Sequence, residues 1–428
     1  MQHIQMGKRL LVIAPHPDDE ALGSAGIIQH ALASGNQVKV VLMTTGDGFT
    51  SAVEVNYQLL SPGPSDYRRM GEERHLETLA AMTHLGVPKE NVIFLGYPDG
   101  GVNTLWQSNW DTNNLLRATN GSERAPYAFS YEKNAPYCGE NVVKNLTKII
   151  HDYQPTDIVY PDPNDQHPDH WATNAFVKYV LAEQHYHAQE LTYLVHRGDF
   201  PVPWLYRPNH SLNPPHALVG LDTRWVHLPM NEQEEQKKRE AISKYVTQVK
   251  VMNPFLEAFV RTNELVGTYV PAVLPHTTGQ PNVNQLEKTS ITFCKDAMRD
   301  TIRRELHKEA DIYTVGGVQS DHGIHIRLDT RAPINARVTY NIRLRIFEPG
   351  IVRRIDLAFY DSKLTSSMYA SNSLKLPPGS AYLVKDNRLW VHLPAILTDQ
   401  TTDFLISADT LVGNELVDKT AWQLVRVK

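Results

Sequence analysis

The stretch that decides the predicted fold is Leu10-Leu11-Val12-Ile13-Ala14-Pro15-His16-Pro17-Asp18-Asp19-Glu20. Its four consecutive apolar residues, 10–13, predict a short strand that is buried on both faces. An imidazole and carboxylates follow at once, and a helical pattern begins at Ala21. His16, Asp18 and Asp19 are therefore expected in a loop at the carboxyl end of a strand, which is where ligands bind in open α/β sheets.

A second stretch repeats this arrangement of strand, polar loop and helix. The apolar run 157–160 leads into Pro161-Asp162-Pro163-Asn164-Asp165-Gln166-His167-Pro168-Asp169-His170, and a helical pattern follows from Trp171 onward. His167 and His170 are three residues apart at the start of that helix, so their side chains can face the same side. If the two strands are parallel neighbours, both loops meet at one edge of the sheet. A lone His-Pro-Asp is usually a capped turn, but the two loops together indicate a site for a divalent cation.

The first two thirds of the chain alternates strand and helix patterns. This order predicts an α/β fold with a doubly wound, mainly parallel sheet, because strands separated by helices form right-handed parallel crossovers. Further strands are expected at 37–43, 91–96 and 191–195, and helices at 21–33, 66–85, 141–153 and 231–248.

Composition excludes several classes of protein. The chain has 428 residues, 41% of them hydrophobic and 21% charged, which is enough for two globular domains. Its formal net charge of −5 argues against a nucleic-acid binder, and it lacks the run of about 18 apolar residues that spans a membrane. Residues 1–9 lack the apolar core of a signal peptide, so a cytoplasmic protein is expected unless such a peptide has been removed. Cys138 and Cys294 are expected to be ordinary thiols.

A change in sequence character divides the chain. Residues 271–285 are rich in Pro, Thr and Asn and are expected to link a first domain, 1–270, to a second, 286–428. Short runs of alternating apolar and polar residues after the linker predict an all-β sandwich. Because the second domain has no His/Asp cluster like the two loops, we expect an accessory role: glycan binding, one wall of the cleft, or self-association as a homo-oligomer.

The two loops together resemble a known family. Pro15-His16-Pro17-Asp18-Asp19-Glu20 and His167-Pro168-Asp169-His170 are similar to the paired signatures of the PIG-L/LmbE-like N-deacetylases. The resemblance covers about residues 8–270. It implies a Rossmann-like fold, a Zn²⁺ cofactor and the removal of acyl groups from N-acyl sugars.

The same resemblance implies a role for each residue of the two loops. His16, Asp19 and His170 would bind Zn²⁺, which leaves a fourth position for water. Asp18 would then be the general base that accepts the proton of this water. His167 matches the family histidine that stabilises the oxyanion, and it is also a candidate to protonate the departing amine.

Other candidate residues have a functional and a structural interpretation. By resemblance Arg74 binds substrate, although a solvated helix face would also explain it. Asp99 follows a predicted strand and would bind sugar hydroxyls or shape the turn. His196 would line the cleft or belong to an ordinary turn. Asp169 would cap its helix or orient a ligand histidine.

A long insertion between residues 102 and 141 is rich in aromatic residues. Loops of this length are usually functional or disordered, and the aromatic content disfavours disorder. Trp106 and Trp110 are therefore predicted to stack on the faces of a sugar substrate. Packing of the insertion on itself is the alternative.

The leading functional hypothesis is a zinc-dependent hydrolase that removes an acetyl or other acyl group from an amino sugar, such as N-acetylglucosamine, or from a glycoconjugate. One alternative keeps the enzyme but makes the substrate a non-carbohydrate amide. Another is a carbohydrate-binding protein with a structural metal, which the open coordination position disfavours because structural zinc normally has four protein ligands. The sequence does not identify the sugar, its aglycone or the acyl group.

Overall fold

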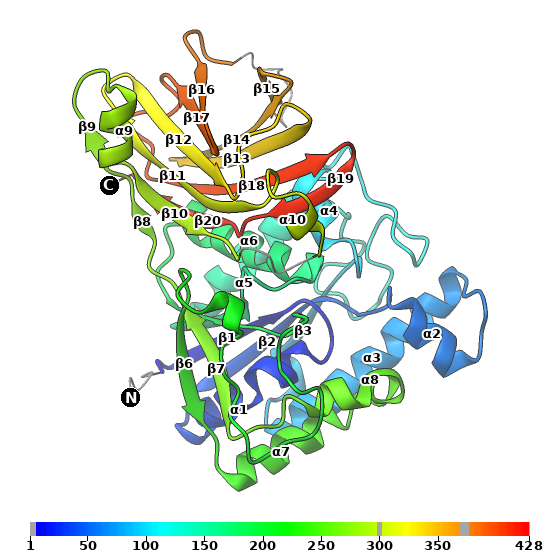
Figure 1. Cartoon of the computed structure of the whole chain (residues 1–428). Helices are drawn as coiled ribbons and strands as arrows, with labels where there is room; N and C mark the ends of the chain where they lie inside the picture. Colours follow the sequence, from blue (N-terminus) through cyan, green and yellow to red (C-terminus); the bar gives the residue numbers. More distant parts are fainter. Residues whose placement is uncertain (1–5, 298–301, 368–375, 428) are drawn as a thin grey trace. The chain divides into compact units, whose positions relative to one another are not determined.

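The computed structural model describes residues 6–297, 302–367 and 376–427. Residues 1–5, which belong to the stretch considered as a signal peptide, lie outside this part. The chain divides into two compact units (Figure 1). The first comprises Met1–His216 and Arg224–Thr268, and the second comprises Ala217–Thr223 and Tyr269–Lys428.

A seven-stranded mixed sheet forms the centre of the first unit, with the order β3-β2-β1-β4-β5-β7-β6. The five strands from β3 to β5 pair in parallel, and β7 and β6 join them antiparallel. The predicted α/β architecture is confirmed, whereas the two antiparallel strands were not predicted. The strands are β1 (Arg9–Ala14), β2 (Gln37–Thr44), β3 (Val92–Tyr97), β4 (Asp157–Pro161), β5 (Gln189–Tyr193), β6 (Arg224–Pro229) and β7 (Asn263–Thr268).

The two predicted loops begin on neighbouring strands. β1 and β4 are parallel, with Leu10 opposite Asp157 and Val12 opposite Val159. Both strands are buried almost throughout, which explains why their sequences are apolar and do not alternate. The loops that follow Ala14 and Pro161 therefore meet at one edge of the sheet.

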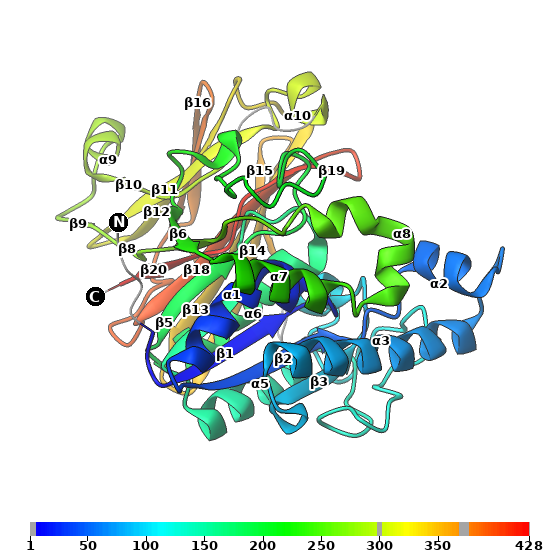
Figure 2. The ribbon, with the colours of Figure 1, turned by 90° about the horizontal axis from the view of Figure 1, so that it is seen from below.

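Helices cover the sheet on two sides, as Figure 1 shows. One group contains α1, α3, α7 and α8, with α2 against α8, and in the other group α6 contacts α4 and α5. Figure 2 shows α7 beside α1 and α8 beside α2. The helices are α1 (Asp19–Ala33), α2 (Thr50–Tyr57), α3 (Pro64–Leu85), α4 (Val102–Gln107), α5 (Gly139–Tyr153), α6 (Pro168–Glu183), α7 (Glu232–Ile242) and α8 (Val246–Glu257), with short 3₁₀ turns at Lys89–Asn91 and His216–Leu218.

The predicted helices at 21–33, 66–85 and 141–153 each begin two residues earlier in the structure, so Asp19 is the first residue of α1 and not part of the loop, and two other helices differ more. The single helix expected over 231–248 is wrong, because α7 ends at Ile242 and α8 begins at Val246. Tyr245 lies in the break, fully buried, and its hydroxyl donates to the carboxylate of Glu20; the neighbouring Ser243, Val246 and Thr247 are weaker helix formers than the Glu, Gln and Lys residues of α7. The helix α6 starts at Pro168, three residues earlier than predicted.

The second unit is rich in strands, as predicted from the alternating pattern. Its described part contains two sheets that are antiparallel except where the short strands β8 and β9 join, and their apolar residues form one core. The expected linker, 271–285, contains β8 and β9, which pair with strands of this unit. The elements are β8 (Ala272–Val273), β9 (His276–Thr277), α9 (Val283–Thr289), β10 (Ile291–Lys295), α10 (Ile302–Leu306), β11 (Ile312–Ser320), β12 (Gly323–Thr330), β13 (Val338–Glu348), β14 (Ile351–Tyr360), β15 (Lys363–Ser367), β16 (Ala381–Lys385), β17 (Arg388–Leu393), β18 (Asp403–Val412), β19 (Glu415–Lys419) and β20 (Gln423–Arg426).

Two further observations concern membrane-spanning helices and the two cysteines. Over the described ranges, the structure contains no helix with the length and apolar character needed to cross a bilayer. Cys138 and Cys294 are both buried free thiols.

The close approach of α1 to β5 gives a test of the fold. A Cβ atom on Gly23 would lie 2.4 Å from Cδ2 of Tyr193, whose ring is fully buried and whose hydroxyl donates to the carbonyl oxygen of Ile13. We expect Gly23→Ala to lower the free energy of unfolding by about 1–2 kcal/mol, because overpacking outweighs the gain in helix propensity. Denaturant melts measure this, with Ala33→Ser at the exposed end of α1 as control. A Gly23→Ala protein as stable as the parent would contradict the packing described here.

Candidate active site

Three side chains from the two loops converge on a common point. The Nδ1 atom of His16 lies 3.1 Å from Oδ2 of Asp19, and Nε2 of His170 lies 3.0 Å from the same oxygen. The two imidazole nitrogens are 3.3 Å apart. Ligand atoms of a tetrahedral zinc ion with bonds near 2.0–2.1 Å are themselves about 3.3 Å apart. The three donors therefore have the spacing that such an ion requires.

The loop before α1 holds Asp18 in an unusual backbone conformation. Its φ is 116°, a value that residues with a side chain rarely adopt and that costs about 1–3 kcal/mol. Neighbouring groups hold this conformation in place. The N–H of Asp18 donates to Oε2 of Glu20 at 3.1 Å, and Nη2 of Arg74 donates to the carbonyl oxygen of Pro17 at 2.5 Å.

Arg74 also contacts the side chain of Asp18. Its Nη2 lies 3.3 Å from Oδ2 of Asp18, and its Nη1 donates to the carbonyl oxygen of Gly46 at 2.7 Å. Arg74 is only 3% exposed, so the alternative of a solvated helix face is wrong. Burial, together with the charges of Asp19 and Glu20, raises the pKa of Asp18 well above its usual range, although Arg74 opposes this shift.

Carboxylates other than that of Asp19 orient the two histidines, His16 and His170. We call His16, Asp19 and His170 the donor set. Nε2 of His16 lies 3.2 Å from Oδ1 of Asp99 and 3.2 Å from Oδ2 of Asp169, and Nδ1 of His170 lies 3.1 Å from Oδ2 of Asp165. Such contacts fix the orientation and tautomer of a metal-binding imidazole. Asp165 was not predicted as a site residue, although its position in the same loop as His170 was a usable signal.

Asp169 and Asp99 also bind backbone groups. Asp169 lies inside the first turn of α6, whose N-cap is His167, so the interpretation of Asp169 as the cap is wrong. Its carboxylate accepts hydrogen bonds from the N–H groups of Gly100 and Val102. Oδ2 of Asp99 accepts from the N–H of residue 48 at 2.7 Å. Both carboxylates therefore tie the loop after β3 to the donor set.

His167 and His196 flank the donors as neutral rings. Burial and the neighbouring charges of His16 and His170 lower the pKa of His167 to about 4, and burial with His170 lowers that of His196 to about 3. Nδ1 of His167 accepts from the N–H of Asp169, so the neutral ring carries its proton on Nε2. The Nε2 atom of His196 lies 3.7 Å from the other carboxylate oxygen of residue 19.

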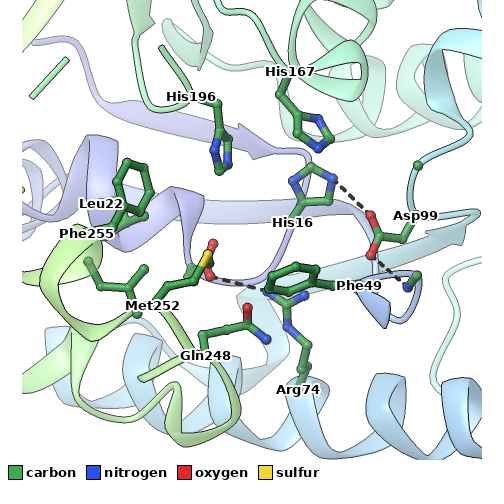
Figure 3. Close-up of a pocket in the computed structure, with 14 residues that line it drawn as sticks. His16, Leu22, Phe49, Arg74, Asp99, His167, His196, Gln248, Met252 and Phe255 are labelled. Carbon is green, nitrogen blue, oxygen red and sulfur yellow. Dashed lines mark hydrogen bonds and ion pairs between the residues drawn. The ribbon is translucent and has the colours of Figure 1, made fainter. Parts of the chain in front are cut away.

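A cavity of about 360 Å³ opens over the donor set. In Figure 3, His16, His167 and His196 lie close together, with Asp99 on one side and Phe255 on the other. Six predicted site residues line the cavity, together with residues of α8 and the loop after β2 that were not predicted. The lining residues are His16, Asp18, Leu22, Gly48, Phe49, Arg74, Asp99, Gly100, His167, His196, Gln248, Met252, Phe255 and Leu256.

Trp106 and Trp110 are not brought to this cavity. Trp106 is fully buried and Trp110 is 7% exposed, and their rings pack against Phe176 of α6 with centroids 5.0 and 6.0 Å away. The prediction that they stack on substrate is therefore corrected. The insertion buries its large aromatic surfaces in the core of the first unit, which stabilises an otherwise irregular segment.

The donor set fits a zinc ion with an open position. Nitrogen and carboxylate oxygen are ligands that zinc accepts, and the buried Oδ1 atom of Asp19 has no hydrogen-bond partner. His196 is the only further member of this His/Asp group within the described residues, but its side chain is 30% exposed, against 0–8% for the other three. We therefore expect three protein ligands.

This ligand set can be tested by metal analysis of purified variants. His16→Ala, Asp19→Ala and His170→Ala should each lose bound zinc, because each removes one of three ligand atoms. His196→Ala should keep about one zinc per chain and serves as the matched control. A His196→Ala protein that folds but contains no zinc would instead indicate a closed site with four protein ligands.

Part of the chain matches a known protein family. Residues 11–181 match the PIG-L family, described as GlcNAc-PI de-N-acetylase. The 1D-myo-inositol 2-acetamido-2-deoxy-alpha-D-glucopyranoside deacetylase of Salinispora arenicola is 30% identical over 169 residues, 38% of this chain and 47% of the relative. The enzyme of that name from Corynebacterium glutamicum is 25% identical over 180 residues, 42% of this chain and 54% of the relative. The matches thus span about half the length of these relatives.

A solved structure is also similar to this chain. The N,N'-diacetylchitobiose deacetylase of Pyrococcus horikoshii is 20% identical, with a TM-score of 0.37, and the match covers 60% of this chain and 82% of that protein. The resemblance seen in the two loops is confirmed by the family match, which includes His16, Asp19 and His170. The chain therefore contains a PIG-L domain at residues 11–181.

Proposed function

We propose that this chain is a zinc-dependent N-deacetylase that hydrolyses the linear amide of an N-acetylated amino sugar or of a glycoconjugate that contains one. The observation that carries the proposal is the convergence of three ligand atoms beneath a cavity that Asp18 and His167 also line. The names of the relatives support an acetamido sugar as the substrate class.

His16, Asp19 and His170 would hold the ion in this proposal. When bound there, zinc supplies a Lewis acid for the amide carbonyl and lowers the pKa of a water molecule to about 7. The carboxylates of Asp99, Asp165 and Asp169 keep the two imidazoles in place. The site is thus held in position before substrate arrives, and little reorganisation is needed during the reaction.

Asp18 is the proposed general base. Its carboxylate lines the cavity and is not needed as a ligand, so it can accept a proton from the attacking water. Burial raises the pKa of this carboxyl above its usual range, which makes its ionised form a stronger base than an exposed carboxylate. The protonated Asp18 can then deliver its proton to the nitrogen as the carbon–nitrogen bond breaks.

His167 is proposed to stabilise the developing oxyanion. Its ring is neutral at pH 7 and carries its proton on Nε2, because Nδ1 accepts from the backbone of α6. A neutral imidazole can donate this hydrogen bond to the amide oxygen as negative charge develops. The low pKa makes His167 a poor acid for the departing amine, so that role is assigned to Asp18.

Two finer features of the architecture also belong to this proposal. We propose that the first unit is a Rossmann-like domain and that the strand-rich second unit is a β-sandwich with an accessory role. The two sheets of the second unit share one apolar core, which supports the sandwich arrangement.

The role of Asp18 can be tested by Asp18→Asn. The variant should keep its zinc and lose turnover by about 10²–10⁴-fold, because it removes the base and leaves the ligands intact. Zinc content and kcat are measured on the same preparation, with Asp152→Asn as an exposed control on α5. Loss of the metal in Asp18→Asn would show that Asp18, and not Asp19, is the ligand.

The proposed reaction can be tested by acetate release. The full chain should release acetate from N-acetylglucosamine and its methyl glycoside, lose this activity after treatment with a chelator, and regain it with added zinc. N-acetyl amino acids are the comparison substrates. Hydrolysis of these amides in preference to the sugars would favour a non-carbohydrate substrate, and zinc binding without any hydrolysis would favour a structural metal.

A further inference from the structure

The cavity has two chemically different sides. Its polar side carries His16, Asp99 and Arg74, with Phe49 beside them in Figure 3, and four further apolar side chains line the cavity. We call these four the apolar wall: Leu22, Met252, Phe255 and Leu256. Figure 3 shows Leu22, Met252 and Phe255 together on the side away from Asp99.

A kink in α8 builds most of this wall. Met252 has φ −130° and ψ 21°, which is not helical, and Pro254 lies inside the same helix. Proline lacks the N–H that continues the helical hydrogen-bond ladder, so it favours a kink at this point. Met252, Phe255 and Leu256 at and after the kink all line the cavity.

The wall continues outward as a series of aromatic rings. The ring of His196, beside the ligand atoms, stacks on Phe255 with a centroid distance of 5.7 Å and an interplanar angle of 20°. Phe255 meets Trp204 edge to face at 5.3 Å, and Trp204 is 49% exposed. Val202 and Leu205 are also exposed. These ring contacts lead from His196, beside the ligand atoms, to the exposed Trp204, and exposed apolar residues next to a cavity commonly mark binding sites.

The polar residues of the cavity are largely occupied by other contacts. The two oxygens of Asp99 contact His16 and a backbone N–H, and both terminal nitrogens of Arg74 donate to backbone carbonyls. Among the side chains that line the cavity next to the wall, only Gln248 presents an amide. The side of the cavity formed by the apolar wall is thus better suited to alkyl or aryl groups than to sugar hydroxyls.

We propose that the apolar wall binds an alkyl or aryl group that the substrate carries close to its scissile amide. This inference rests on the proposed deacetylase function and narrows its substrate to amphipathic N-acyl amino sugars. The apolar group can come from two sources, an aglycone at the anomeric carbon or an acyl chain longer than acetyl. Burial of each additional methylene favours binding about fourfold, so a hexyl group that is half buried gains more than tenfold.

Two series of substrates test the wall on the full, zinc-loaded chain. The first contains methyl, butyl and hexyl glycosides of N-acetylglucosamine, and the second contains N-acetyl, N-butanoyl and N-hexanoyl forms of the methyl glycoside. We expect kcat/KM to rise at least tenfold along one series, which identifies the source of the apolar group. Phe255→Ala and Trp204→Ala should reduce the ratio of kcat/KM between the longest and shortest substrates to about 2 or less.

Leu60→Ala is the matched control, because Leu60 is fully exposed and does not line the cavity. It should leave the ratio unchanged. If Phe255→Ala does not fold, Trp204→Ala alone tests the wall, because it should reduce the same ratio of kcat/KM. The inference is overturned if neither series rises, or if the rise survives in both wall variants.

A binding measurement separates failure of this inference from failure of the proposed function. Calorimetry compares the longest and shortest members of both series on the parent chain and on Trp204→Ala, without any turnover. If no substrate is hydrolysed but the longest member of one series still binds at least tenfold more tightly to the parent, the inference about the wall holds and the deacetylase proposal fails. Equal binding of the longest and shortest members in both series rejects the wall whatever the activity.

Discussion

The parallel pairing of β1 with β4 is the constraint on which the site depends. His16 and His170 are far apart in the sequence, and only the register that places Leu10 opposite Asp157 brings their nitrogens to 3.3 Å. At the start of β4 the buried carboxylate of Asp157 accepts from the N–H of Gly7 at 2.8 Å, a contact that depends on this register. The hydrophobic core of the first unit thus positions three polar atoms.

Burial of these groups has an electrostatic cost. Asp18, Asp19, Asp165 and Asp169 are each at most 5% exposed, and an isolated buried carboxylate costs several kcal/mol. The structure offsets this cost with backbone N–H donors and neighbouring imidazoles. Burial alone would raise the pKa of Asp19, but His170 and His16 hold it well below its usual range. The carboxylate therefore stays ionised, as a metal ligand must be.

The sequence predicted the parts of the site that depend on local patterns. Apolar runs followed by His and Asp identified the two loops, and their family resemblance assigned Asp18 and His167. It did not predict features that depend on packing between distant segments. Trp106 looked like a ligand-binding residue because nothing local indicates that its ring packs on α6. The cavity-lining residues Met252, Phe255 and Leu256 lie beyond the helix predicted over 231–248 and were not predicted, because the kink at Met252 is not visible in the local sequence pattern.

The segment from Tyr245 to the end of α8 has two roles: its first residues support the loop that carries Asp18, and its later residues line the cavity. At its amino end, the hydroxyl of Tyr245 holds Glu20, which in turn holds the backbone of Asp18, and Thr247 donates its N–H and hydroxyl to the carboxylate of Glu77 on α3. Beyond the kink, Phe255 and Leu256 line the cavity, and Glu257 accepts hydrogen bonds from Arg239 of α7. Natural variation should follow this boundary: relatives with other substrates can exchange residues after Met252, whereas exchanges before it would disturb the loop that carries the base.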